Sequence, residues 1–65
     1  MNIVAIHNLT DEQLHSELES SLRELMNLRF RWSTRQINNP RELGEVRKTI
    51  ARLKTVMRQR GVRES

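Results

Sequence analysis

Residues 39–60 read NPRELGEVRKTIARLKTVMRQR, and this stretch carries the clearest structural signal in the chain. Asn39 is a favourable N-cap, and Pro40 suits the first position of a helix, where its missing N–H is not needed. Gly61 follows directly and is the residue type that most readily turns left-handed after a last helical turn. The stretch therefore predicts a helix over residues 40–60.

Within this helix the apolar and basic residues occupy separate faces. The apolar residues recur every three or four positions and form one seam: Leu43, Val46, Ile50, Leu53 and Met57. At about 100° per residue, one basic stripe flanks this seam, formed by Arg47, Lys54 and Arg58. A second basic stripe lies on the far side, formed by Arg41, Lys48 and Arg52. The helix thus offers one face to another helix and a wide cationic surface to a polyanion.

A second helix start lies upstream. Thr10 and Gln13 have the spacing of a capping box, in which each side chain accepts the other residue's backbone N–H. Leu9 and Leu14 have the spacing of a hydrophobic staple around the same start. We therefore expect a helix that begins at residue 11.

From this start, apolar residues recur every three or four positions: Leu14, Leu18, Leu22, Leu25, Leu28 and Trp32. No Gly or Pro interrupts the pattern before Pro40, so it predicts one helix over residues 11–36. Since Trp32 falls on the leucine seam, we expect it to pack near the turn between the two helices.

Met26, Phe30 and Ile37 project roughly 120° away from the leucine seam and form a second apolar strip. Two helices alone would leave this strip bare. Residues 1–8 have no clear secondary-structure signal, and we expect them to cover part of the strip. The alternative is contact with a protein or RNA partner, of which the most specific form is Phe30 stacking on a base.

Residues 37–40 form the only turn signal inside the chain. So short a connection forces the second helix to run back along the first. We therefore expect an all-α fold, a single helical-hairpin domain over residues 1–65. It has antiparallel helices at 11–36 and 40–60 and a short N-terminal segment.

The composition points to a soluble chain with a polyanionic partner. The 65 residues include no cysteine, no signal peptide and no apolar run long enough to span a bilayer, so we expect a cytoplasmic protein. One core of this size rarely contributes more than about 3–5 kcal/mol, so a partner is expected to help hold the fold. The net charge of +4 is uneven, because residues 33–65 hold nine basic groups against three acids. Such asymmetry favours an oriented contact with a polyanion.

Catalytic and metal-binding patterns are missing from the sequence. His7 and His15 are eight positions apart without a nearby cysteine and do not make a metal site. The acids are spaced along the surface rather than paired, and there is no nucleophile–base pair or Gly-rich phosphate loop. We expect neither an enzyme nor a bound cofactor.

Three segments together match the pattern of one known family. Asn39-Pro40 followed by EVRKTIARLKTV at residues 45–56 resembles the signature of the bacterial large-subunit ribosomal protein numbered twenty-nine. LRFR at residues 28–31 resembles its Leu-Arg-Phe-Gln segment, and LTDEQL at residues 9–14 resembles its usual opening. The resemblance covers about residues 9–60, in order and without gaps.

The resemblance implies a non-enzymatic helical hairpin on the surface of the large ribosomal subunit in the cytoplasm, near the exit of the peptide tunnel. It implies two partners, large-subunit ribosomal RNA and the neighbouring ribosomal protein numbered twenty-three. Resemblance and charge together indicate the RNA-binding residues, the last two of them secondary: Arg47, Lys48, Arg52, Lys54, Arg58, Arg29 and Arg31.

The chain departs from the family pattern in three places. Its first eight residues lack the lysines common there and are more apolar. Arg35 stands where a glycine is frequent. Gly44 stands where a basic residue is common, and it should weaken its helical turn by roughly 1 kcal/mol relative to alanine.

Two other classes of function fit parts of the sequence. A hairpin that only binds a partner helix would explain the apolar seams but not the basic second half, and weak salt dependence of binding would identify it. Nonspecific DNA binding would explain the charge, and a comparison of duplex DNA with folded ribosomal RNA would separate it from RNA recognition.

Overall fold

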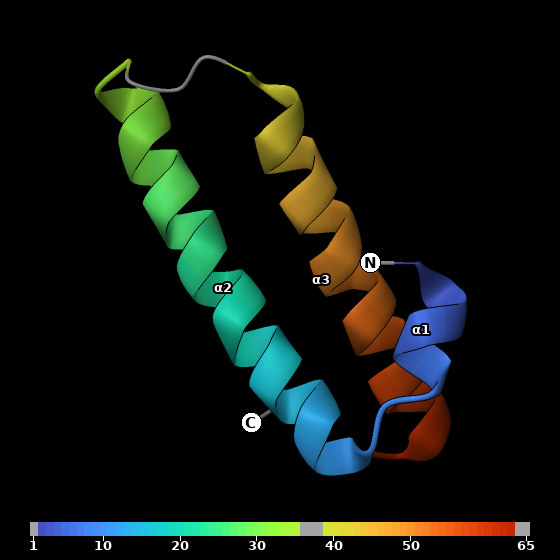
Figure 1. The fold of residues 1–65 in the computed structure, drawn as a ribbon. Helices are drawn as coiled ribbons and strands as arrows, with labels where there is room; N and C mark the ends of the chain where they lie inside the picture. Colours follow the sequence, from blue (N-terminus) through green and yellow to red (C-terminus); the bar gives the residue numbers. More distant parts are fainter. Residues whose placement is uncertain (1, 36–38, 64–65) are drawn as a thin grey trace.

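The computed structural model describes residues 2–35 and 39–63, and all regular secondary structure in these ranges is helical. The helices are α1 (Ile3–His7), α2 (Asp11–Ser33) and α3 (Arg41–Arg60). The two long helices run antiparallel side by side, and α1 lies against the C-terminal half of α3 (Figure 1). The predicted all-α hairpin is therefore confirmed, with the N-terminal segment forming a helix of its own. None of the described helices combines the length and apolar character that a membrane span needs.

The start of α2 follows the sequence prediction. The Thr10 hydroxyl oxygen accepts the Gln13 N–H at 3.1 Å, and the Gln13 side-chain carbonyl accepts the Thr10 N–H at 2.9 Å. The capping box is therefore confirmed. Leu9 and Leu14 both belong to the core, with Leu9 partly and Leu14 fully buried.

The end of α2 comes earlier than predicted. The helix stops at Ser33, so the predicted limit at residue 36 is wrong. The physical cause is Arg35, whose φ of 58° is left-handed and cannot continue a right-handed helix. The Arg35 N–H still bonds to the Trp32 carbonyl at 3.1 Å, which closes the last turn.

The start of α3 lies one residue later than predicted. Pro40 occupies the cap position and Arg41 is the first helical residue. Asn39 nevertheless supplies a side-chain hydrogen bond, because its Oδ1 accepts the Arg41 N–H at 3.0 Å.

The end of α3 lies where Gly61 predicts it. Gly61 adopts a left-handed φ of 71°. Its N–H bonds to the Arg58 carbonyl at 3.1 Å, and the Val62 N–H bonds to the Met57 carbonyl at 2.8 Å. This pair of bonds is the Schellman motif, and the partly buried Val62 adds the hydrophobic contact that often accompanies it.

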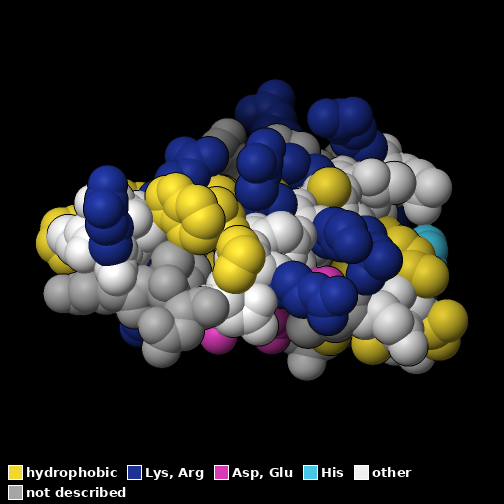
Figure 2. All heavy atoms as spheres, turned by 90° about the horizontal axis from the view of Figure 1, so that it is seen from above, with side chains coloured by type: hydrophobic (Ala, Val, Ile, Leu, Met, Phe, Trp, Pro, Cys, Tyr) yellow, Lys and Arg dark blue, Asp and Glu magenta, His cyan; other side chains and the backbone are white. Residues whose placement is uncertain are grey.

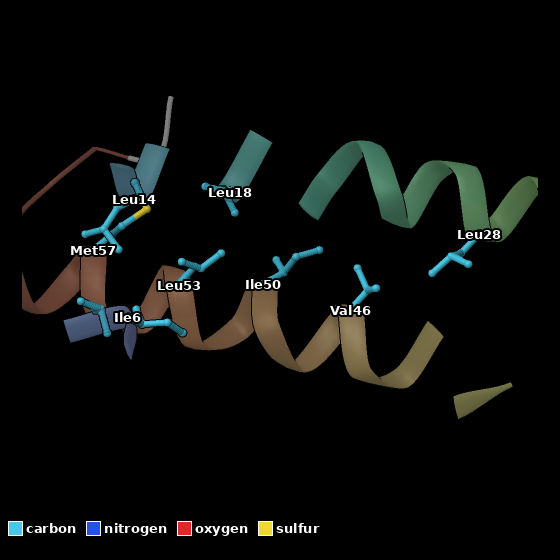
Figure 3. Packing of buried hydrophobic residues seen from close by; sticks show 9 residues of the cluster. Ile6, Leu14, Leu18, Leu28, Val46, Ile50, Leu53 and Met57 are labelled. Carbon is cyan, nitrogen blue, oxygen red and sulfur yellow. The ribbon is translucent and has the colours of Figure 1, made fainter. Parts of the chain in front are cut away.

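The core is one apolar cluster shared by the three helices (Figure 3). The predicted seam of α3 is confirmed, because four of its residues are buried and Leu43 is partly buried. The buried apolar residues are Ile6, Leu14, Leu18, Leu28, Val46, Ile50, Leu53, Val56 and Met57.

The predicted seam of α2 is partly wrong. Leu22 and Trp32 are 40% and 51% exposed, whereas the small Ser21 is buried at 7%. The helix therefore turns the side that carries Ser21 toward α3 and leaves Leu22 at the edge. Trp32 lies one turn beyond Leu28, the last buried residue of α2, and so falls outside the core.

The expected cover of the second apolar strip is also wrong. Met26 and Phe30 are 72% and 65% exposed, and Ile37 lies outside the described residues. The N-terminal residues instead form α1, which packs against α3 and buries Ile6 completely. Val56, which is not on the predicted seam, is fully buried as well, so α3 has an apolar surface wider than that seam.

Arg60 joins the two ends of the chain. Its guanidinium donates hydrogen bonds to the carbonyls of His7 at 2.6 Å and Leu9 at 2.5 Å. The same group lies 3.4 Å from an Asp11 carboxylate oxygen. Arg60 therefore holds the connection between α1 and α2 against the last turn of α3.

Candidate nucleic-acid interface

The predicted RNA-binding residues all lie on the two long helices. Six of them are exposed, and Lys54 is half-buried beside the core. Their positions around the helix axes decide which of them can touch one partner at the same time.

A groove between α2 and α3 defines one side of the hairpin, called here the groove side. Its part nearest the loop is lined by Glu24 and Arg31 of α2 and by Glu42 and Glu45 of α3. Glu17 extends the acidic lining toward the middle of the molecule. The groove side is therefore mainly acidic, and Arg31 lies among carboxylates there.

The opposite side of the hairpin is basic. Arg47, Lys54 and Arg58 lie about 140–180° around the α3 axis from Glu45 at 100° per residue. The buried seam separates them from the groove. The same reasoning puts Arg29 about 160° from Arg31 around the α2 axis, and therefore on the basic side.

The structure thus divides the predicted set. The basic side, defined as Arg29, Arg47, Lys54 and Arg58, brings together one residue of α2 and three of α3. Lys48 lies on the outer surface of α3, away from α2, whereas Arg52 lies about 20° around the α3 axis from Glu45 and therefore near the groove side. Figure 2, a view from the loop end, shows Lys and Arg over its upper part and extending across its middle, and Asp and Glu in its lower half.

The basic side can serve as a rigid array of cations. Its residues project from packed helices, so their spacing along each axis is fixed by the helical rise of ~1.5 Å per residue. Arginine presents planar donors that bridge two phosphate oxygens, and lysine acts as a point charge. Such an array suits a phosphate backbone better than a small anion, which needs an enclosed pocket.

The structure assigns Arg60 a role that sequence reasoning missed. In a helical projection Arg60 does not differ from the other cations of α3. In the structure its side chain donates hydrogen bonds to the His7 and Leu9 carbonyls. No sequence signal could reveal this, because Arg60 lies 49 to 53 positions along the chain from His7, Leu9 and Asp11.

Metal binding finds no support in the described part of the chain. Within residues 2–35 and 39–63, no group of three or more His, Asp or Glu is placed to hold a metal ion. The same ranges contain no buried side-chain nitrogen or oxygen without a hydrogen-bond partner.

Comparison with known proteins identifies a related family. The family model described as Ribosomal L29 protein matches residues 5–60. This match begins within α1 and ends at the last residue of α3, so it includes the complete hairpin.

Several relatives are similar over most of their length, and each is called large ribosomal subunit protein uL29. The protein of Caldicellulosiruptor bescii is 48% identical over 60 residues, which are 92% of this chain and 83% of the relative. That of Finegoldia magna is 48% identical over 92% of this chain and 88% of its own. That of Dehalococcoides mccartyi is 50% identical over 92% of each.

Proposed function

The chain belongs to the ribosomal L29 protein family, and from this premise we propose that it binds large-subunit ribosomal RNA through its basic helix faces. Proteins of this family are structural, non-enzymatic constituents of the large ribosomal subunit. The chain is therefore a ribosomal component with ribosomal RNA and other ribosomal proteins as partners. In a bacterial cell its place is the cytoplasm.

The observation that carries the proposal is the separation of charge across the hairpin. Acidic residues line the groove between α2 and α3, whereas Arg29, Arg47, Lys54 and Arg58 share the opposite side. RNA helices are recognised mostly by shape and backbone, so a rigid basic surface needs no loop that reads base edges. The basic side is therefore the surface that faces RNA.

The remaining predicted residues extend this contact. Lys48 on the outer surface of α3 can reach RNA that wraps around that helix, and the contribution of Arg52 is smaller because it lies near Glu45. Arg31 points toward the acidic groove, so its contribution is smaller than that of Arg29. The family resemblance further supports a position near the exit of the peptide tunnel, beside the ribosomal protein numbered twenty-three.

The test is a binding titration with two RNAs of equal length at several salt concentrations. One is a folded fragment of large-subunit ribosomal RNA, and the other is an unrelated structured RNA. We expect tight binding to the first that persists at physiological salt, and much weaker binding to the second. Equal and steeply salt-sensitive binding to both would contradict specific recognition.

A charge variant tests which side meets the RNA. Replacing Arg47, Lys54 and Arg58 with glutamine removes three cations while keeping good helix formers. The slope of log K against log salt should become shallower by about 2–3, since each phosphate contact contributes about 0.9. Arg23→Gln is the matched control, because Arg23 is exposed and 4.0 Å from Glu19 in the same helix. An unchanged slope in the triple variant would place the contact elsewhere.

A further inference from the structure

The loop end of the hairpin gathers the aromatic side chains of this protein. Residues 29–35 read RFRWSTR, and every one of them is exposed. Phe30 and Trp32, the only phenylalanine and the only tryptophan of the chain, are 65% and 51% exposed. Large aromatic side chains usually dominate the core of a small fold, yet here neither belongs to it.

The segment that forms this end, residues 29–41, carries a positive charge equal to the net charge of the whole chain, and Glu24, Glu42 and Glu45 line the groove beside it. Residues 29–41 contain no Asp or Glu and four arginines: Arg29, Arg31, Arg35 and Arg41. Of twelve Lys and Arg in the chain, eight remain elsewhere, and they match the eight acids. The net charge of +4 therefore equals the charge of this segment. Figure 2 shows hydrophobic side chains next to Lys and Arg at this end.

The backbone that presents these side chains is ordered by local hydrogen bonds. The Ser33 hydroxyl donates to the Phe30 carbonyl at 2.8 Å, and the Thr34 hydroxyl lies 3.1 Å from the Arg31 carbonyl. These bonds occupy carbonyls at the negative end of the helix, which would otherwise repel a phosphate. Phe30 and Trp32 thus project from the last turn of α2, about 160° apart around its axis, and Arg35 lies in the hydrogen-bonded turn that follows.

We propose that this loop end binds unpaired RNA nucleotides, with Phe30 and Trp32 stacking on bases and Arg29 and Arg35 holding the adjacent phosphates. The inference rests on the proposed RNA-binding function and adds the class of RNA element that this part of the hairpin recognises. Exposed aromatic rings surrounded by cations are the usual means of binding single-stranded nucleic acid, because every base has a face that can stack. Folded RNA presents such bases in its loops and bulges.

A protein partner fits the loop end less well. An apolar protein surface would bury the rings, but it would also take nearby arginines out of water without phosphates to pair with them. Burying unpaired charges is costly. The charge of the segment therefore favours RNA.

The single tryptophan makes the test direct. The full chain is titrated with a short oligoadenylate and with an RNA duplex of the same length, and Trp32 fluorescence is recorded. Stacking on a base should quench the emission with the single strand and leave it nearly unchanged with the duplex. Quenching that is equal for both, or missing for both, would overturn the inference.

Variants separate this inference from the proposed function. The double variant Phe30→Leu, Trp32→Leu keeps apolar side chains at exposed positions but removes both rings. Its affinity for labelled oligoadenylate, measured by anisotropy, should fall at least about 10-fold. Met26→Leu, on the same helix and 72% exposed, is the control and should bind like the wild type. Circular dichroism verifies that each variant keeps its helices.

A folded fragment of large-subunit ribosomal RNA completes the comparison. If the wild type and the double variant bind this fragment equally well, the loop-end inference is overturned and the proposed function stands. If the wild type does not bind the fragment, both the proposed function and the loop-end inference are overturned. If the double variant binds RNA normally but no longer enters the large subunit, the rings contact a protein and the inference is overturned.

Discussion

Arg35 lies two residues beyond the end of α2 at Ser33 and prevents the helix from continuing. Its φ of 58° puts a long side chain in the left-handed region, which costs a residue with a Cβ roughly 1–2 kcal/mol. This conformation destabilises the folded state locally, just after the end of α2. In the family that the sequence resembles, glycine is frequent at this position. The left-handed backbone gives a physical reason, because glycine adopts it without a steric penalty.

Replacing Arg35 with glycine should therefore stabilise the protein. The relief of the left-handed penalty exceeds the extra entropy that glycine has in the unfolded chain, so we expect a gain of about 0.5–1 kcal/mol. Thermal unfolding without RNA should show a melting temperature higher by about 2–8 °C. Arg29→Gly, the same change inside α2, is the control and should lose about 1 kcal/mol. A loss of stability in both variants would contradict the strain assigned to Arg35.

Some of the residues that set the helix boundaries could be recognised from the sequence, and others could not. Thr10 with Gln13, and Gly61, act on backbone groups a few positions away, so their pattern in the sequence is sufficient. Arg35 has no such pattern, because arginine is a good helix former and nothing local marks it as left-handed. The end of α2 was therefore the least predictable boundary.

At the scale of the helices, packing decided what periodicity left open. Leu22 and Trp32 fit the three-four spacing of α2 as well as Leu18 and Leu28 do. Only Leu18 and Leu28 are buried, because α3 covers part of the predicted seam and not all of it. The burial of Ser21 shows where the contact is centred. The docking of α1 was equally hidden, since five residues contain too little pattern to indicate which helix they cover.

Arg60 makes the α1 contact testable. Arg60→Met removes a guanidinium that donates to the His7 and Leu9 carbonyls, and hydrogen bonds from a charged donor contribute roughly 1.5–3 kcal/mol. We expect a loss of about that size in chemical unfolding. Arg58→Met, an exposed position on the same helix, is the control and should change stability by less than about 0.5 kcal/mol.

Asp11→Asn distinguishes the carbonyl bonds from the ion pair. The Asp11 carboxylate is 63% exposed and 3.4 Å from Arg60, and such pairs contribute about 0–1 kcal/mol. Its effect should be clearly smaller than that of Arg60→Met. An equal loss in the two variants would show that the ion pair, and not the carbonyl bonds, holds α1 in place.

At the scale of the whole molecule, the hairpin separates charge. The sequence alone predicted the antiparallel fold and the excess of cations, and the basic residues of α3 could be placed on two stripes. It could not relate those stripes to Arg29 and Arg31, because that requires knowing how α2 is rotated against α3. The rotation puts Arg31 beside Glu24, Glu42 and Glu45 and puts Arg29 on the basic side.

The distribution of this protein across a sucrose gradient of ribosomal subunits is the most direct test of its role. Subunits are prepared from the cells that make it, washed at high salt, separated, and analysed by mass spectrometry. We predict that the protein is found in the large-subunit peak and remains there after the high-salt wash. Its appearance with the small subunit, or unbound at the top of the gradient, would contradict a structural role in the large subunit.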